Sequence, residues 1–173
     1  MKTTLEVINQ MQADGVIGKY AIGGAVGATF YLEPSATLDI DIFVSLVKEQ
    51  GSALITLSPI YEYLKAHGHK IQKEHIVIGG WPVQFLPPAD ALAEEALAQA
   101  IETGIEGIRT RVMTAEHLVA IALKTGRAKD HNRILQFIES GALEPDRLDD
   151  ILARHGLLEK WEQFRQKFIE DKR

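Results

Sequence analysis

The chain begins with apolar residues at helical spacing and then changes to the spacing of strands. Leu5, Ile8 and Met11 stand three residues apart before Asp14-Gly15, a pattern typical of a short amphipathic helix that ends in a turn. The run 38–44 is apolar and β-branched except for two aspartates, which predicts a buried strand. The same patterns predict helices over 4–13, 25–32, 59–67 and 89–102, and strands over 20–22, 38–44, 70–78, 82–86 and 105–113.

From Thr114 onward, every segment has a helical pattern. Gly126, Gly141 and Gly156 mark helix ends, because glycine readily takes the left-handed backbone that closes a helix. The predicted helices cover 114–125, 131–140, 145–155 and 157–170. Strands that alternate with helices, followed by helices alone, predict an α/β (α+β) fold, with an α/β core over 1–112 and a helical C-terminal subdomain over 113–173.

Composition narrows the classes of function. The 173 residues include no cysteine, which excludes disulfides, thiolate zinc sites and cysteine nucleophiles. No stretch is apolar enough for a membrane span, and residues 1–14 lack the pattern of a signal peptide, so we expect a cytoplasmic protein without a membrane partner. The net charge of −5 argues against binding to extended DNA.

Two acids interrupt the apolar run 38–44. Side chains alternate along a strand, so Asp39 and Asp41 project on one face and Ile40 on the other. Two carboxylates held side by side in an apolar strand repel each other, and one would tend to keep its proton. A divalent cation removes that conflict, and paired carboxylate oxygens suit Mg²⁺, which keeps its other positions for water and phosphates.

A glycine pair precedes the acids. Gly23-Gly24 stands where the strand 20–22 passes into the helix 25–32. Glycine lets the backbone come close to a ligand, and the amides at the start of a helix attract phosphate oxygens. The sequence therefore predicts a phosphate-binding bend near the proposed metal ligands.

Gly-Gly, a short helix and Asp-x-Asp within a strand together resemble the nucleotidyltransferase superfamily, whose core is of the DNA polymerase β type. The chain is most similar to the minimal and abortive-infection (AbiE-type toxin) branches, and the segment 124–133, Lys-Thr-Gly-Arg-Ala-Lys-Asp-His-Asn-Arg, is similar to a basic segment in their helical part. The resemblance covers about 20–44 and 112–137, and it implies a mixed sheet flanked by helices.

The resemblance also implies an activity: metal-dependent transfer of a nucleoside monophosphate from an NTP to an acceptor, with release of pyrophosphate. Asp39 and Asp41 would hold Mg²⁺. The acceptor would be a small molecule, a protein side chain or an RNA end, and a toxin–antitoxin-like role would be expected. The implied catalytic residues are Asp39, Asp41, Lys124 and Asp130, and the implied substrate-binding residues are Gly23, Gly24, Thr37, Arg127 and Lys129.

Two positions depart from the family pattern. Family members commonly carry a third carboxylate on a later strand, where this chain has Gln84. A neutral amide cannot act as a general base and is a weak metal ligand. The related toxins also often carry an arginine just before the acid pair, where this chain has 35–37, Ser-Ala-Thr. A second hypothesis is therefore an impaired relative that binds a nucleotide or a partner protein.

Each motif also has a simpler interpretation. Asp39 and Asp41 could face solvent on an edge strand, and the glycine pair could be an ordinary turn. The basic segment 124–133 could cap helices. His67, His69 and His75 lack the spacing of metal ligands, so we expect them to be surface histidines; nothing in the segment suggests a zinc site.

Overall fold

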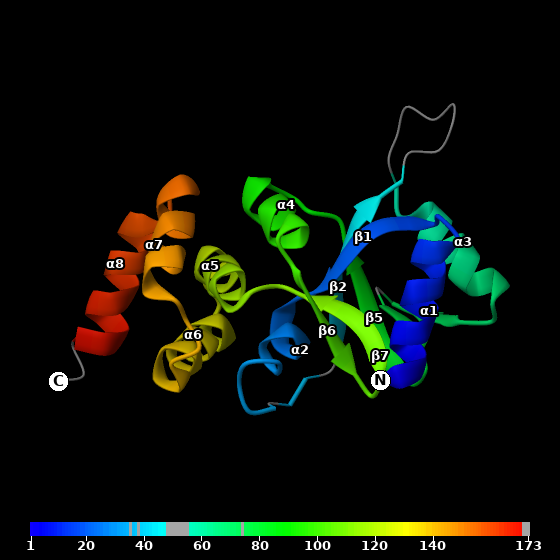
Figure 1. The fold of residues 1–173 in the computed structure, drawn as a ribbon, viewed down its shortest axis with the longest axis horizontal. Helices are drawn as coiled ribbons and strands as arrows, with labels where there is room; N and C mark the ends of the chain where they lie inside the picture. The colour runs from blue at the N-terminus through cyan, green and yellow to red at the C-terminus, as the bar shows by residue number, and fades with distance from the viewer. Residues whose placement is uncertain (35, 38, 48–55, 74, 171–173) are drawn as a thin grey trace.

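The computed structural model describes residues 1–34, 36–37, 39–47, 56–73 and 75–170. Figure 1 shows a sheet with α1 and α3 at one side and α5 to α8 gathered at the other end. The helices are α1 Lys2–Ala13, α2 Gly24–Ala28, α3 Ser58–Ala66, α4 Ala91–Ala98, α5 Ala115–Thr125, α6 Ala128–Ser140, α7 Pro145–Arg154 and α8 Leu158–Arg165, which continues into the π-helical turn η1 Gln166–Glu170. The strands are β1 Ile17–Ile22, β2 Ile40–Leu46, β3 Lys70–Gln72, β4 His75–Ile78, β5 Trp81–Leu86, β6 Ile101–Ile105 and β7 Ile108–Val112.

The seven strands form one mixed sheet in the order β3-β4-β5-β2-β1-β7-β6. β2 runs parallel to β5 and antiparallel to β1, and β1 runs parallel to β7. β2 therefore has a neighbour on both sides, so the edge-strand interpretation of its acids does not hold. The α/β architecture with a mixed sheet and later helices is the fold class that the sequence predicts.

The two faces of β2 have different surroundings. Ile40, Ile42 and Val44 are fully buried in a cluster that also contains apolar residues of α1 and α3. Phe43 points to the opposite face and packs against the cluster of α4 and α5. Because successive side chains alternate, Asp41 shares the face of Phe43. The acid therefore points away from the apolar layer and towards the helical part.

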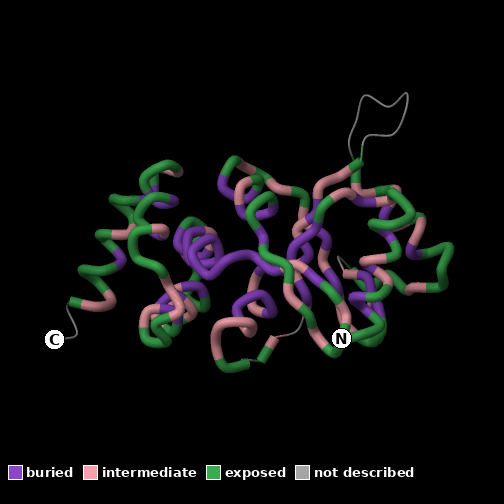
Figure 2. The backbone as a smooth tube through the Cα atoms, viewed as in Figure 1, coloured by how far each residue is buried: buried purple, intermediate pink, exposed green. Residues whose placement is uncertain are grey.

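α5 connects the sheet to the other C-terminal helices. It is buried along most of its length, as Figure 2 shows. It ends at Gly126 and α6 ends at Gly141, and both glycines have the left-handed backbone expected from the sequence. No helix in the described part of the chain has the length and apolar character needed to cross a membrane.

Two predicted elements of the α/β core need correction. The segment 70–78 forms two strands rather than one, and the turn between them includes Lys73 with φ of 56°. The helix predicted over 89–102 ends at Ala98, and Ile101–Ile105 is the strand β6. β6 pairs with β7 through a turn at Glu106-Gly107, where both residues have positive φ. Leu38, the predicted first residue of the strand 38–44, and Ser35 lie outside the described residues.

A charged cluster on Glu95 ties α4 to the C-terminal helices. The Glu95 carboxylate accepts hydrogen bonds from His117 Nε2 at 3.0 Å, from His155 Nε2 at 2.8 Å and from the Arg154 guanidinium. The hydrogen bonds from Arg154, followed by those from the two histidines, outweigh the effect of burial and lower the pKa of Glu95. His117 is fully buried, and its pKa is lowered mainly by that burial, so the imidazole is neutral at pH 7.

We expect Glu95→Gln to lower the free energy of unfolding by about 2 kcal/mol at pH 7, because the amide cannot accept from all three donors. The folded-state pKa of Glu95 lies below the ordinary value of 4.5, so its stabilisation is present above that pH and is lost on acidification. Urea unfolding of Glu95→Gln and of the unmodified protein at several pH values measures this difference in the free energy of unfolding. The exposed neighbour change Glu94→Gln is the control; equal stability of Glu95→Gln and the unmodified protein at pH 7 would contradict the prediction.

Candidate functional site

The two acids of β2 lie in one cleft. Asp39 immediately precedes β2 and Asp41 is its second residue, and both line a polar cavity of about 460 Å³. Burial, followed by the charge of Asp39, raises the pKa of Asp41, although nearby cations oppose this effect. The structure thus brings the carboxylates together on one face, in a place where a negative charge is costly without a cation.

The glycine pair is tied directly to the acids. The Gly23 amide donates to the Asp41 carbonyl oxygen at 2.9 Å, which fixes the bend beside β2. Gly24 has φ of +57°, and a Cβ atom there would overlap the Asp41 carboxylate and lie 2.9 Å from its Cγ. Only glycine combines easy access to this positive φ with the absence of a Cβ atom, so the glycine motif and Asp41 form a single structural unit.

Thr37 lies at the same rim of the polar cavity. Its hydroxyl donates to the Asp39 carbonyl oxygen at 3.0 Å and so holds Thr37 next to Asp39. The structure therefore places Thr37 beside Asp39, Asp41 and Gly24, as a residue that shapes the cleft.

The opposite wall comes from α6. Lys129, Asn132, Arg133 and Gln136 occupy positions i, i+3, i+4 and i+7, and all four line the polar cavity. This spacing places them on one face of the helix, towards the acids. The sequence assigns a role only to Lys129 among these four residues, because its pattern predicts a helix that begins at about 131; with the observed start at Ala128, the spacing becomes visible.

Asp130 interacts with two arginines of this wall, Arg127 and Arg133. Its carboxylate, which is 2% exposed, accepts from Arg127 Nε at 2.7 Å and Nη2 at 3.1 Å, and Arg133 Nη1 lies 3.6 Å away. Burial would raise the pKa of Asp130, but the hydrogen bonds from Arg127 and the charges of both arginines outweigh it and lower the pKa. Asp130 is therefore an anion that orients Arg127 and Arg133 towards the cleft.

Lys124 is not brought into the cleft. It lies in the last turn of α5, and its Nζ donates to Asp90 Oδ2 at 2.7 Å. Asp90 caps the N-terminus of α4 by accepting from the Ala93 amide. Lys124 lines neither cavity of the site, and its contact stabilises the junction between α4 and α5.

Gln84 takes the place next to Asp41 on β5. The parallel register pairs the two residues, and both side chains line the polar cavity. Within the described residues, no group of three or more His, Cys, Asp or Glu side chains is placed to hold a metal. The donor set for a cation is therefore two carboxylates and one neutral amide oxygen, which fits a hard cation that also keeps several waters.

A second cavity of about 320 Å³ adjoins the polar one. The two share Gly24, Asp41, Gln84, Arg127 and Arg133, so they meet at Asp41. One wall of the second cavity is apolar and comes from β2, β5, α5 and the residue between β7 and Thr114: Phe43, Leu86, Met113, Leu118, Ile121 and Ala122. Polar side chains, including Arg127, Asp130 and Arg133, line the rest of it. We call it the apolar cavity. Its apolar residues are not identified from the sequence, where they only show the pattern of a core.

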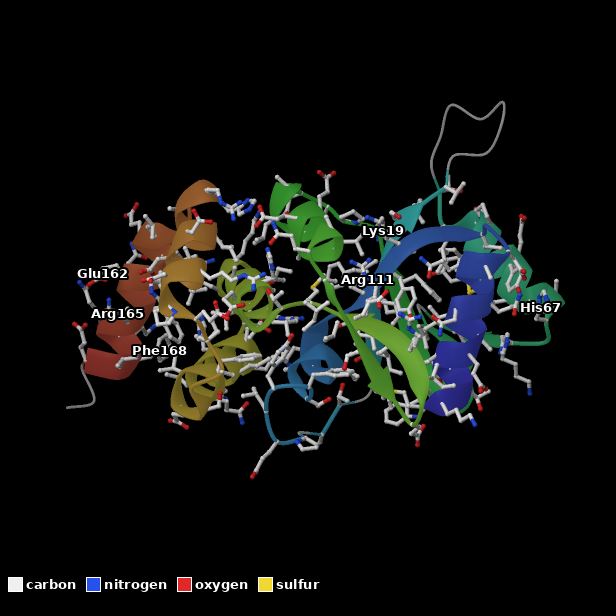
Figure 3. All side chains as sticks on the ribbon, in the orientation of Figure 1. Lys19, His67, Arg111, Glu162, Arg165 and Phe168 are labelled. Carbon is white, nitrogen blue, oxygen red and sulfur yellow. The ribbon has the colours of Figure 1, made fainter. Side chains whose placement is uncertain are left out.

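The three histidines of the segment 67–75 have different places. His67 ends α3 on the opposite side of the molecule from α5 to α8 (Figure 3) and stacks on Tyr63. His75 instead contacts a residue of the cleft, because its Nε2 is 3.0 Å from Asp39 Oδ2. His75 is only partly exposed, and the sequence does not indicate its contact with Asp39.

Comparison of the sequence with protein-family models gave no match, and comparison with curated proteins gave none either. Solved structures do match. An antigenic nucleotidyltransferase-like protein from Paracoccidioides brasiliensis aligns with a TM-score of 0.59 and 17% identity over 88% of this chain and 85% of its own. ANT(2")-Ia in complex with adenylyl-2"-tobramycin aligns with a TM-score of 0.53 and 15% identity over 96% of this chain and 99% of its own.

A solution structure of the antibiotic-resistance factor ANT(2")-Ia gives a similar result, with a TM-score of 0.52 and 16% identity over 94% of this chain and 97% of its own. These identities are low, so the likeness concerns the fold. The resemblance to the AbiE-type branch stays a prediction. The fold is therefore similar to that of a nucleotidyltransferase-like protein and of ANT(2")-Ia.

Proposed function

We propose that the protein is a metal-dependent nucleotidyltransferase that transfers a nucleoside monophosphate from an NTP to an acceptor. The observation that carries the proposal is the cleft itself. On one wall, the Asp39 and Asp41 carboxylates lie beside the Gly24 bend; on the other, α6 presents Lys129 and Arg133. Phosphoryl transfer requires carboxylates that bind a cation and basic side chains that bind phosphates, and the two walls of the cleft offer these groups.

Asp39 and Asp41 would hold Mg²⁺. Bound there, the ion would supply positive charge that offsets the negative charge of the phosphates and of the departing pyrophosphate. Arg127 and Arg133, which are oriented by Asp130, donate to phosphate oxygens from the opposite wall. The acceptor oxygen forms a bond to the α-phosphorus while the bond from that phosphorus to pyrophosphate breaks, and the acceptor proton passes to solvent.

The two cavities suggest how a nucleotide would lie. A nucleoside triphosphate has an anionic end and a planar, largely apolar end. The polar cavity suits the phosphates, and the apolar cavity beside Phe43 and Met113 suits the base. Asp41 lines both cavities, so a metal held there would lie near the α-phosphate, between the two ends of the proposed ligand. ANT(2")-Ia is crystallised with an adenylylated tobramycin, which supports a small-molecule acceptor for this chain.

We expect an NTP to stabilise the protein only when Mg²⁺ is present. A ligand at 100 times its dissociation constant adds about 2.7 kcal/mol to the free energy of unfolding. In a chain of this size, that raises the thermal midpoint by about 5–10 °C. The measurement is thermal unfolding with each NTP, with and without Mg²⁺. No shift with any NTP at millimolar concentration would contradict both the transferase and any nucleotide-binding role.

Gln84 favours a second candidate, a module that binds a nucleotide without transferring it. Beside Asp41, the neutral amide offers no base for an acceptor hydroxyl. Incubation with α-labelled NTP, Mg²⁺ and cell extract distinguishes the two functions. Label that becomes attached to an acceptor supports the transferase, whereas Mg²⁺-dependent binding without transferred label supports the binding module.

A further inference from the structure

His75 contacts one of the proposed metal ligands from a different strand. It is the first residue of β4, and its Nε2 lies 3.0 Å from Asp39 Oδ2. The side chains of His75 and Asp39 are 29% and 34% exposed, so the contact lies at the rim of the cleft, partly shielded from solvent. The distance between the two atoms is that of a hydrogen bond.

The sheet register places His75 in the row of the site residues. Ile76 of β4 pairs with Val83 of β5, and the next residue of β5, Gln84, pairs with Asp41 of β2. His75 precedes Ile76, so the antiparallel register puts it level with Gln84. Residues level with each other on neighbouring strands project from the same face. The imidazole thus points to the side of the sheet that carries the acids.

In this hydrogen bond, the imidazole is the donor and the carboxylate is the acceptor. An ionised carboxylate can only accept, so the imidazole Nε2 donates to Asp39 Oδ2. That bond occupies one direction at Oδ2, so the other oxygen, Oδ1, can still bind a cation. Asp39 stands before the start of β2, where hydrogen bonds between strands do not yet restrain it. The other hydrogen bond described at Asp39 involves its backbone, whose carbonyl oxygen accepts from the Thr37 hydroxyl. The bond from His75 therefore fixes the orientation of the Asp39 carboxylate.

We infer that His75 is a positioning residue of the proposed metal site. By donating a hydrogen bond from its Nε2–H group to Asp39, it holds that carboxylate in the orientation that receives the divalent cation. The inference rests on the proposed function, because it requires a cation at Asp39 and Asp41. Hydrogen-bond partners behind metal ligands commonly affect metal affinity by about 10- to 100-fold.

The test is the affinity for Mn²⁺ alone, measured without nucleotide by electron paramagnetic resonance of the free ion. Two variants differ in where they place an amide donor. In His75→Gln the amide nitrogen reaches the position of imidazole Nε2, whereas in His75→Asn it corresponds to Nδ1 and falls short of Asp39. We expect His75→Asn to bind Mn²⁺ about 10- to 100-fold more weakly, and His75→Gln to recover most of that loss.

His69→Asn is the matched control: unlike His75, His69 makes no hydrogen bond to Asp39 or Asp41 within the described residues, so its replacement should leave Mn²⁺ binding unchanged. The thermal midpoint without metal shows that each variant folds. If His75→Asn binds Mn²⁺ as tightly as the unmodified protein, or if His75→Gln is as weak as His75→Asn, the inference is overturned while the metal site stands. If the unmodified protein binds no Mn²⁺, both the inference and the proposed metal site are overturned.

Discussion

Replacement of Asp39 and Asp41 together by asparagine is expected to abolish Mg²⁺-dependent stabilisation by NTP and to reduce label transfer by about 10³-fold or more. The loss follows because a bound cation contributes several kcal/mol to a phosphoryl transition state, and each 1.36 kcal/mol is about tenfold in rate. The fold should persist. Burial and the charge of Asp39 already raise the pKa of Asp41, so removal of the two charges does not lower the free energy of unfolding of the metal-free protein.

Thermal unfolding with Mg²⁺-NTP and the transfer of α-label measure both effects. Asp146 and Asp149 are exposed on α7, and their double change to asparagine alters the net charge equally. This control should behave like the unmodified protein. A variant at Asp39 and Asp41 that transfers label at the normal rate would remove these acids from the mechanism.

Gly24→Ala is expected to abolish Mn²⁺ and Mg²⁺-NTP binding, although the change adds only a methyl group. The new Cβ would overlap the Asp41 carboxylate, which would have to leave the position beside Asp39. The left-handed backbone at φ of +57° adds a cost of about 1–2 kcal/mol for alanine. Metal binding by calorimetry and unfolding by urea separate the two effects.

Gly156→Ala provides the matched control. Gly156 has φ of +68°, and an added Cβ there meets nothing within 4 Å. It should lose a similar amount of stability but keep metal binding. If Gly24→Ala binds Mn²⁺ as well as Gly156→Ala does, the close approach of Gly24 to Asp41 is not needed for the site.

The sequence predicts the parts of the site that lie close together along the chain. Alternation along a strand requires Asp39 and Asp41 to share a face, and glycines before a short helix indicate a close backbone approach. The structure places Gly24 directly against Asp41. These expectations succeed because the backbone geometry of one strand and one turn determines them.

Contacts between distant segments could not be predicted in the same way. His75 meets Asp39 only because β5 lies between β4 and β2 in the sheet. Lys124 belongs to the expected basic segment, but its direction depends on the N-terminus of α4, where Asp90 accepts a hydrogen bond from its Nζ. β6 was missed because the alanine-rich segment before it continued the helical pattern, and only the turn at Glu106-Gly107 signals the hairpin.

The most direct test of the proposed metal site is a crystal structure of the protein with Mn²⁺ and a non-hydrolysable NTP analogue. We predict an anomalous difference peak within bonding distance of both the Asp39 and the Asp41 carboxylates, with the analogue's phosphates between that ion and the face of α6 that carries Lys129 and Arg133. Nucleotide bound elsewhere, or bound in the cleft without an ion at the two aspartates, would contradict the proposal.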